Sequence, residues 1–166
     1  MEMLDVYDDY GNRVGKTIER SKARELVDGE HIAVGVIFIE NSEGKFLIQK
    51  TSLEKGGLYS STGGHITNGE SPIISIKREV LEEIGIDIND DDIVDLGFIS
   101  YDMPIRFMFY LKKDIDINNI KVQDEEVEYV VYMNVDEIKE LIKNKLITES
   151  HGIIFNKILE YKEKLL

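Results

Sequence analysis

The order of its segments predicts a mixed α/β (α+β) fold for this chain, built as one domain over residues 1–166. A chain of 166 residues fits a single domain and is long enough to bury a hydrophobic core. Strand-like segments come before and after one amphipathic helix, and two more helices close the chain. Because strands and helices do not alternate regularly, we expect a mixed sheet with helices on its faces.

The first half of the chain reads as short strands and turns. Residues 3–7 and 14–18 have strand-like sequences around a turn, and residues 21–27 are compatible with a short helix. The continuous apolar run at 32–39 is long enough for a strand buried on both faces. A turn leads from it into a second strand at 46–50.

A helix is predicted at 72–84 by signals at both of its ends. Ser71 is a good N-cap, Pro72 suits the first helical position, and Gly85 suits a left-handed stop. Counting roughly 100° per residue from Glu79, Glu82 falls about 60° to one side and Glu83 about 40° to the other. Three carboxylates therefore share one face. The aliphatic residues are expected on the opposite arc, buried against the core: Ile73, Ile74, Ile76, Val80, Leu81 and Ile84.

The acidic face of this helix predicts a metal site. Like charges one turn apart repel by a few tenths of a kcal/mol, and a hard cation with carboxylate ligands, Mg²⁺ or Mn²⁺, would offset that repulsion. Such an ion orients a polyphosphate and lowers the pKa of a bound water, so that hydroxide can attack phosphorus. Arg78 lies beside this face and could hold one glutamate through a bidentate ion pair. The alternative is that the acidic face is only solvated.

The last third of the chain predicts three strands and two helices. Residues 98–101 and 105–111 read as strands on either side of Pro104, and residues 127–133 as a later strand. A helix should begin after Asn134, which forms a capping-box pattern with an acidic residue three positions on. Helical spacing indicates a final helix, through Ile154, Ile158, Tyr161 and Leu165.

Composition and charge exclude several classes of protein. The chain has no Cys, which excludes disulfides, thiolate catalysis and Cys-based zinc sites. No apolar run approaches 18 residues and the N-terminus is acidic, so we expect a cytoplasmic protein with no membrane partner. A net charge of −13 argues against a nucleic-acid partner. The same charge repels a polyphosphate substrate, which makes a metal ion more necessary.

Residues 64–86 read GHITNGESPIISIKREVLEEIGI and fill the whole pattern G-x5-E-x7-R-E-U-x-E-E-x-G-U, where U is aliphatic. Seven positions demand one residue type each, so a chance match at a given start is on the order of 10⁻⁷ or rarer. Those positions are occupied by Gly64, Glu70, Arg78, Glu79, Glu82, Glu83 and Gly85. The segment resembles the Nudix box, the catalytic motif of hydrolases that cleave nucleoside diphosphates linked to another group.

The resemblance implies an α/β/α sandwich with the box as loop–helix–loop. It covers about residues 31–146 as a Nudix core, with residues 1–30 as an N-terminal extension and 147–166 as a C-terminal helix. The implied activity is metal-dependent hydrolysis of a diphosphate linkage in a nucleoside diphosphate derivative or related organic pyrophosphate. A non-catalytic Nudix-fold sensor is the alternative, although such sensors usually lose box glutamates or gain a DNA-binding domain, and neither is seen here.

The resemblance also assigns roles within the box. It implies that the metal is held by the side chains of Glu82 and Glu83 and by the backbone carbonyl of Gly63, with Glu79 as a ligand or as the base that orients water. Arg78 belongs to the catalytic set, while Gly64, Glu70 and Gly85 shape the motif. A contact between Glu70 and Arg78 would clamp the loop to the helix.

Part of the chain is similar to one branch of this family, the isopentenyl-diphosphate isomerases and their hydrolase cousins. The similar segments are residues 4–8, Gly11-Asn12, His31 and residues 61–65. In isomerases, histidines matching His31 and His65 help bind a metal, and a cysteine in the slot of Gly63 moves a proton. Because this chain lacks Cys and keeps an intact box, isomerase activity is not expected. Two interpretations of the histidines stay open: packing or hydrogen bonding near the site, or a secondary metal or phosphate contact.

Relatives also use a carboxylate from outside the box, placed before their last strand. Here the acidic segment 124–128 precedes the strand at 127. By period two, Glu126 and Glu128 point to one face of that strand and Glu125 to the other. We expect Glu126 to join the site as ligand or base, with Glu125 and Glu128 as the alternatives. A charged edge that discourages strand aggregation would explain Glu128.

The sequence does not identify the substrate beyond a small-molecule diphosphate. Lys50, Tyr59 and Arg106 are candidate substrate-binding residues. Tyr101 and Phe109 could also flank a nucleobase or another group, although aromatic residues in strands more often belong to a core. Whether the protein is a monomer or a homodimer stays open.

Overall fold

The computed structural model describes residues 2–122 and 125–166. Its helices are α1 (Pro72–Ile84), α2 (Val135–Lys143) and α3 (Glu149–Lys164), with short 3-10 helices η1 (Arg20–Glu25), η2 (Leu53–Lys55), η3 (Asp90–Asp92) and η4 (Ile117–Asn119). Its strands are β1 (Met3–Tyr7), β2 (Arg13–Glu19), β3 (Ala33–Glu40), β4 (Phe46–Thr51), β5 (Tyr59–Ser60), β6 (Thr62–His65), β7 (Ile93–Ile99), β8 (Ile105–Lys112) and β9 (Val127–Met133).

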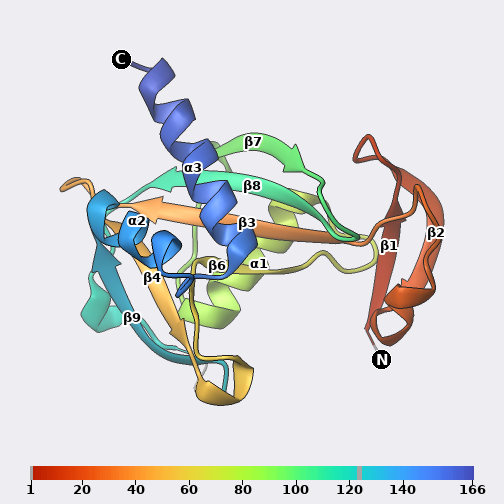
Figure 1. Ribbon diagram of the computed structural model, residues 1–166, viewed down its shortest axis with the longest axis horizontal. Coiled ribbons are helices and arrows are strands. Elements are labelled where there is room, and N and C mark those ends of the chain that lie inside the picture. Colours follow the sequence, from red (N-terminus) through yellow and green to blue (C-terminus); the bar gives the residue numbers. More distant parts are fainter. Residues whose placement is uncertain (1, 123–124) are drawn as a thin grey trace.

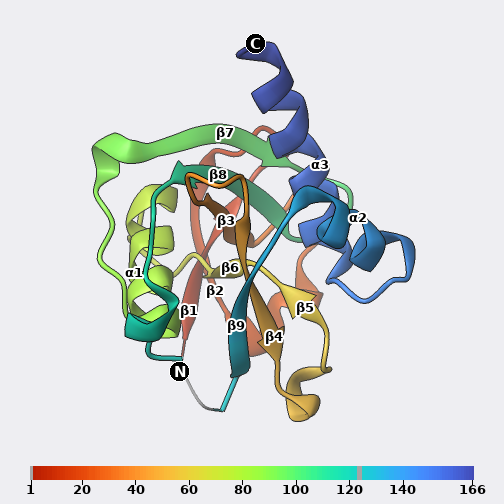
Figure 2. The same cartoon turned by 90° about the vertical axis from the view of Figure 1, so that its left-hand side faces the viewer.

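A mixed sheet separates two helical layers, so the predicted α/β/α sandwich is confirmed. β3 pairs in parallel with β8, whereas the pairs β3–β6, β4–β9 and β7–β8 are antiparallel. Helix α1 covers one face and helices α2 and α3 cover the other (Figures 1 and 2). Successive residues of β3 alternate between the layers: Ile37 packs in the α1 core, and Phe38 packs in the core under α2 and α3.

The sheet forks at its centre. β3 and β4 pair at Glu40 and Phe46 and then diverge. The segment that follows fills the gap, because β5 pairs with β4 and β6 pairs with β3. In this arrangement Gly63 lies opposite Val36 on the central strand. The fork therefore places the loop before α1 in the middle of the sheet.

The ends of α1 agree with the prediction, but its buried arc is narrower and rotated. Ile76, Val80 and Ile84 are fully buried. Ile74 and Leu81 are 55% and 54% exposed, so the prediction that they pack against the core is wrong. The buried arc is centred nearer the acidic residues than predicted. The side of α1 that carries Glu79 and Ile76 lies against β6 and β3, with Glu79 next to Gly64 and Ile76 next to Gly35.

Two further predictions about strands and apolar residues need correction. The strand predicted at 98–101 is β7, which begins at Ile93 and ends at Ile99. Its register shifts between Asp95 and Phe98, and Gly97 has φ +83°, so a bulge interrupts the alternation that marks a strand. Leu165 was expected on the apolar face of the last helix, yet it follows the end of α3 and is 67% exposed.

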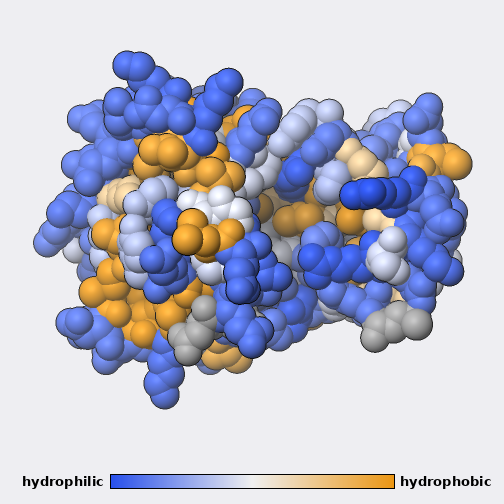
Figure 3. Space-filling view, turned by 60° about the horizontal axis from the view of Figure 1, so that its bottom comes forward, coloured by the Kyte–Doolittle hydropathy of each residue, from blue (hydrophilic) through white to orange (hydrophobic). Residues whose placement is uncertain are grey.

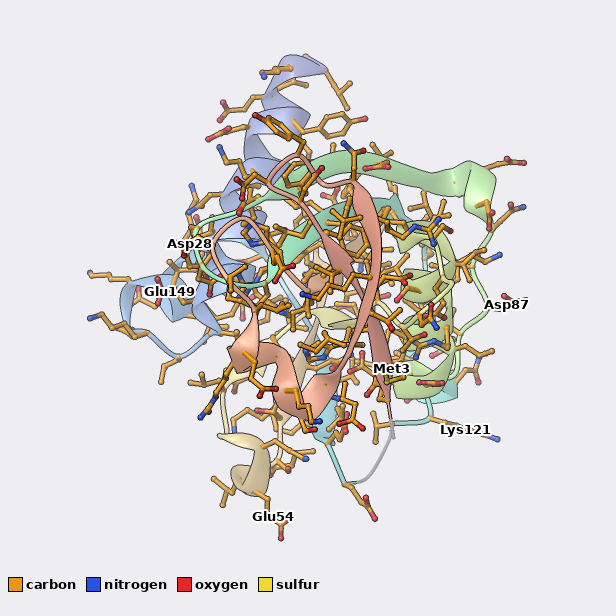
Figure 4. All side chains as sticks on the ribbon, turned by 90° about the vertical axis from the view of Figure 1, so that its right-hand side faces the viewer. Met3, Asp28, Glu54, Asp87, Lys121 and Glu149 are labelled. Atoms are coloured by element: carbon orange, nitrogen blue, oxygen red, sulfur yellow. The ribbon has the colours of Figure 1, made fainter. Side chains whose placement is uncertain are left out.

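β1 and β2 form a separate two-stranded hairpin that is tied to the loop before α1. The backbone N–H of Asn68 donates to the carbonyl of Met3 at 2.9 Å, and the N–H of Gly69 donates to the Asp5 carboxylate at 2.9 Å. Figure 4 views this hairpin from outside, with β1 lying in front of the sheet near α1. The hairpin therefore lies beside the loop between β6 and α1, residues 66–71, which we call the box loop.

Other local predictions agree with the structure. The predicted short helix at 21–27 is present as the 3-10 helix η1, shifted to Arg20–Glu25. The strand at 127–133 is β9, and the capping box that begins α2 is complete. Within the described ranges, no helix is both long and apolar enough to cross a membrane.

The capping box should contribute measurably to stability. The Asn134 carboxamide oxygen accepts from the Glu137 N–H at 2.8 Å, and the Glu137 carboxylate accepts from the Asn134 N–H at 3.1 Å. Asn134→Ala should therefore lower the free energy of unfolding by about 1 kcal/mol in urea titrations. Asn156→Ala, at an exposed position within α3, serves as the control. Equal stability of the two variants would contradict this role for the capping box.

Candidate active site

Two adjoining cavities open at the box loop, on the face shown in Figure 3. The first, which we call the box cavity, has a volume of about 800 Å³, and the second, the side cavity, about 290 Å³. This face is hollowed between the N-terminal hairpin on the right and the rest of the protein (Figure 3). The residues that line both cavities are Arg20, Lys55, Gly63, Glu83, Glu126 and Thr148.

Both glycines of the Gly63-Gly64 pair lie in close contact with their neighbours. A Cβ on Gly63 would lie 2.6 Å from the backbone oxygen of Gly35, so the backbones of β6 and β3 approach too closely for a side chain at this position. A Cβ on Gly64 would lie 2.3 Å from the carboxyl carbon of Glu79, so a side chain there would displace the Glu79 carboxylate. A cysteine in the slot of Gly63, as in the isomerases, would require β3 to move.

Arg78 connects the box loop with the acidic residues of α1. Its Nε and Nη2 donate to the two oxygens of Glu70 at 2.7 and 2.9 Å, the predicted loop–helix contact in bidentate form. Its Nη1 donates to Glu79 at 2.9 Å and to Glu82 at 3.1 Å. Glu70 also accepts from the N–H of Thr67 at 3.0 Å, which closes the loop on itself. Arg78 thus fixes the loop and two glutamates at once.

The three carboxylates of α1 do not share one environment. Glu82 is exposed, whereas the side chain of Glu79 is 15% exposed and Glu83 is 9% exposed as a residue. Burial raises the pKa of Glu79 to about 7, against the opposing effect of Arg78. Burial, and then the charge of Glu79, raise the pKa of Glu83 to about 8. Two desolvated acids therefore face each other beside a solvated one.

The donor chemistry of this cluster fits a hard divalent cation. Among the residues that the structure describes, no three acidic or histidine side chains converge on one point as ligands. Arg78 explains this, because its ion pairs with Glu79 and Glu82 draw these two carboxylates toward the guanidinium group. The side-chain donors of Glu79, Glu82 and Glu83 are carboxylate oxygens, which Mg²⁺ prefers, and each negative charge raises the cost of ionising the next. Added positive charge would stabilise the ionised form of Glu79 and Glu83.

Of the three downstream acids, the structure brings Glu126 to the box. Glu126 lines both cavities, and its charge raises the pKa of Glu79 and Glu83. Glu125 and Glu128 line a different hollow beside η2, and Glu128 pairs with Lys50 at 3.7 Å. Position 124 lies outside the described residues.

The candidate substrate-binding residues lie outside the two cavities. Lys50 follows Gln49, whose side chain reaches Thr62 on the α1 side, and so points to the opposite face of the sheet. The Tyr59 hydroxyl bonds to the Tyr129 hydroxyl at 2.7 Å, on that same face.

Arg106 and Phe109, the other candidates discussed for substrate contact, also lie away from the two cavities. Arg106 pairs with Asp102 and stacks on Tyr101, with 4.9 Å between its guanidinium carbon and the ring centroid. Phe109 is fully buried in the α1 core. Of the two alternatives for Phe109, the structure therefore supports a place in the core and not a contact with a nucleobase.

The two histidines from the isomerase comparison have different surroundings. Both ring nitrogens of His31 are engaged, with Asp9 at 2.6 Å and the Met103 carbonyl at 2.8 Å. Burial lowers the pKa of His31, but these two acceptors outweigh it and raise the pKa overall. His65 lines the box cavity, and burial and then Arg20 lower its pKa. Hydrogen bonding accounts for His31, whereas His65 is available to the site.

Several residues that line the cavities carry little or no signal in the sequence. Arg20, Lys55 and His151 come from η1, η2 and α3, and no spacing in the chain links them to the box. Gln49 carries a signal, because it is the polar residue that follows the apolar run 46–48 in one strand. It is 2% exposed.

The Glu70–Arg78 clamp predicts a pH-dependent stability. The bond from Arg78 holds the pKa of Glu70 at about 2, below its ordinary 4.5. Because the folded pKa is depressed, the stabilisation is complete above pH 4.5 and is lost as the pH falls through about 2. Glu70→Gln should therefore melt below the wild type at pH 7, with a gap that shrinks on acidification. Glu43→Gln, in an exposed turn, is the control, and a gap independent of pH would contradict the clamp.

Comparison with known proteins shows the family and agrees with the fold. The NUDIX domain family model matches residues 29–153. An uncharacterized Nudix hydrolase of Listeria monocytogenes is 28% identical over 145 residues, which is 85% of each chain. The 8-oxo-dGTP diphosphatase of Proteus vulgaris is 34% identical over 77 residues, covering 46% of this chain and 66% of its own. The crystal structure of DR0079 from Deinococcus radiodurans matches with a TM-score of 0.73 at 16% identity, over 93% of this chain and 98% of that one. The chain belongs to the Nudix family of hydrolases.

Proposed function

We propose that this protein hydrolyses the diphosphate linkage of a nucleoside diphosphate derivative or related organic pyrophosphate, with Mg²⁺ as cofactor and Mn²⁺ as a substitute. The observation that carries the proposal is a complete box whose largely buried acids, Glu79 and Glu83, line one cavity with Glu126 and with three cationic side chains. A solvated helix face would not bury its carboxylates.

The proposed metal ligands are the side chains of Glu79, Glu82 and Glu83 and the backbone carbonyl of Gly63. When bound, the ion supplies positive charge to the phosphates and makes water a better nucleophile. Arg78 holds Glu79 and Glu82 in place, and the N–H of Gly63 donates to Glu83 at 3.2 Å, which orients that carboxylate. We assign Glu126 as the base that takes a proton from the attacking water, because it faces the box acids from another element.

Arg20 and Lys55 are proposed to hold the phosphates. Together with Arg78 they are the Lys and Arg side chains that line the box cavity. Arg20 pairs with Glu2 at 3.1 Å, and these side chains are 55% and 37% exposed. An exposed pair of this kind contributes little stability, so a phosphate can replace Glu2 at low cost. The hairpin thereby adds positive charge to a site in a protein of net charge −13.

The reaction can be tested with dinucleoside polyphosphates, nucleotide sugars, nucleoside triphosphates and prenyl diphosphates, each with Mg²⁺ or Mn²⁺ in ¹⁸O-labelled water. A diphosphate-linked substrate should yield two phosphorylated fragments, one of them labelled. Turnover of none of these compounds would contradict the proposal and favour a sensor. Conversion of isopentenyl to dimethylallyl diphosphate without a new phosphorus product would indicate an isomerase.

Glu83→Gln should lower turnover by about two orders of magnitude or more, as expected when a group acting on the transition state is removed. Its circular dichroism spectrum should match that of the wild type. Glu128→Gln is the matched control, because Glu128 is an acid on β9 that lies outside the box cavity. Full activity of Glu83→Gln on every substrate would show that the assignment is wrong.

A further inference from the structure

The side cavity has a chemical character of its own. It lies between β4, β5 and the start of α3, and it opens to the box cavity past Glu83 and Glu126. Val127 is the one aliphatic residue among those that line it, and none of them is Phe, Tyr or Trp. Its neutral polar residues are Gln49, Thr51, Ser60, Ser61, Thr148 and His151. A prenyl chain would find little apolar surface in this cavity, and the imidazole of His151 is the one ring there on which a nucleobase could stack.

His151 has a fixed tautomer that directs a donor toward this cavity. Its Nδ1 accepts a hydrogen bond from the backbone N–H of Ser61 at 2.9 Å. A backbone N–H can only donate, so Nδ1 carries no proton and the neutral ring carries it on Nε2. Burial, and then the charge of Arg106, lower the pKa of His151 to about 4, which keeps the ring neutral near pH 7.

The Nε2–H group of His151 is free to bind a ligand. It donates to no residue in the described part of the chain. The Tyr7 hydroxyl is the one buried side-chain polar atom without a partner among the described residues, so Nε2 itself is not sealed from solvent. Because His151 lines the side cavity, an acceptor placed there can take this hydrogen bond.

Neighbouring groups supply both donors and acceptors. Thr148 precedes α3 and makes no side-chain cap, so the N–H groups of the first turn keep bonding capacity. Gln49 is fixed by its bond from Nε2 to the Thr62 hydroxyl at 2.6 Å. Hydroxyl groups donate and accept, and so match such a lining. A terminal phosphate only accepts, so in the side cavity it could pair with Arg20 and Lys55 but would leave the acceptor groups of the lining unpaired, next to the carboxylates of Glu83 and Glu126.

We infer that the side cavity binds a polyhydroxylated group, such as the sugar of a sugar-bearing organic diphosphate, and that His151 is a specificity-determining residue that donates to one of its hydroxyls. This inference rests on the proposed function and names a substrate class for it. The diphosphate would lie in the box cavity and the sugar in the side cavity, on either side of Glu83 and Glu126.

His151→Asn and His151→Gln form a matched pair for the test. Asparagine can keep an acceptor for the Ser61 N–H but loses the donor at the position of Nε2, whereas glutamine can restore that donor. For a nucleotide sugar, His151→Asn should lower kcat/KM about tenfold, mainly through KM, as expected when one hydrogen bond is lost. His151→Gln should recover part of this loss. For a nucleoside triphosphate, which has no sugar beyond its phosphates, both variants should match the wild type.

Deoxygenated sugars provide an independent readout. A nucleotide sugar that lacks the bonded hydroxyl should be a poorer substrate for the wild type and should show no further loss with His151→Asn. Calorimetric Kd values for the nucleotide sugar, measured in a Glu82→Gln background with slowed turnover, should follow the same pattern. Equal losses on all substrates, or losses confined to compounds with a terminal phosphate, would overturn the inference. A wild type that hydrolyses other diphosphates but neither binds nor cleaves sugar-bearing ones would overturn it while leaving the proposed function intact.

Discussion

The burial of two carboxylates beside each other is the constraint on which the rest of the site depends. Glu79 and Glu83 leave solvent because α1 lies against β3 and β6 with its acidic flank. Their raised pKa values express the cost of that arrangement. Three features hold it in place: the missing side chain of Gly64, the N–H of Gly63 on Glu83, and the Arg78 bridge. Added positive charge would therefore stabilise the ionised forms of Glu79 and Glu83.

The fold brings charged residues from distant segments of the chain to this site. The fork between β3 and β4 carries the box loop into the centre of the sheet, and β9 brings Glu126 to the same edge. The N-terminal hairpin is fixed to the loop by hydrogen bonds from Asn68 and Gly69, η1 after the hairpin contributes Arg20, and η2 contributes Lys55. The metal and the protein cations would therefore share the neutralisation of the box acids and of the proposed substrate phosphates, in a chain whose net charge of −13 repels such anions.

Elements with local signals could be predicted from the sequence, and contacts between distant segments could not. Helix α1 has a capping serine, a proline and a stop glycine within one short window, and its bounds agree with the prediction. The exposure of Ile74 and Leu81 depends on which flank of α1 meets the sheet, and periodicity does not fix that choice. Arg20 lies in η1 and His151 lies at the start of α3. Both reach the site only through the tertiary fold, and no sequence motif predicts these contacts.

If a divalent cation stabilises the ionised forms of Glu79 and Glu83, the melting temperature of the protein should depend on Mn²⁺. At about 100 times its Kd, a bound ion stabilises the folded state by about 2.7 kcal/mol, which corresponds to a rise of about 5 to 10 °C for a domain of this size. We expect that rise for the wild type and its loss in Glu79→Gln/Glu83→Gln. Without metal, this double variant should melt no lower than the wild type, because it lacks the two acidic groups that burial destabilises. A wild type whose melting temperature does not respond to Mn²⁺ or Mg²⁺, or a double variant that keeps the full rise, would show that the cation does not act through these two acids.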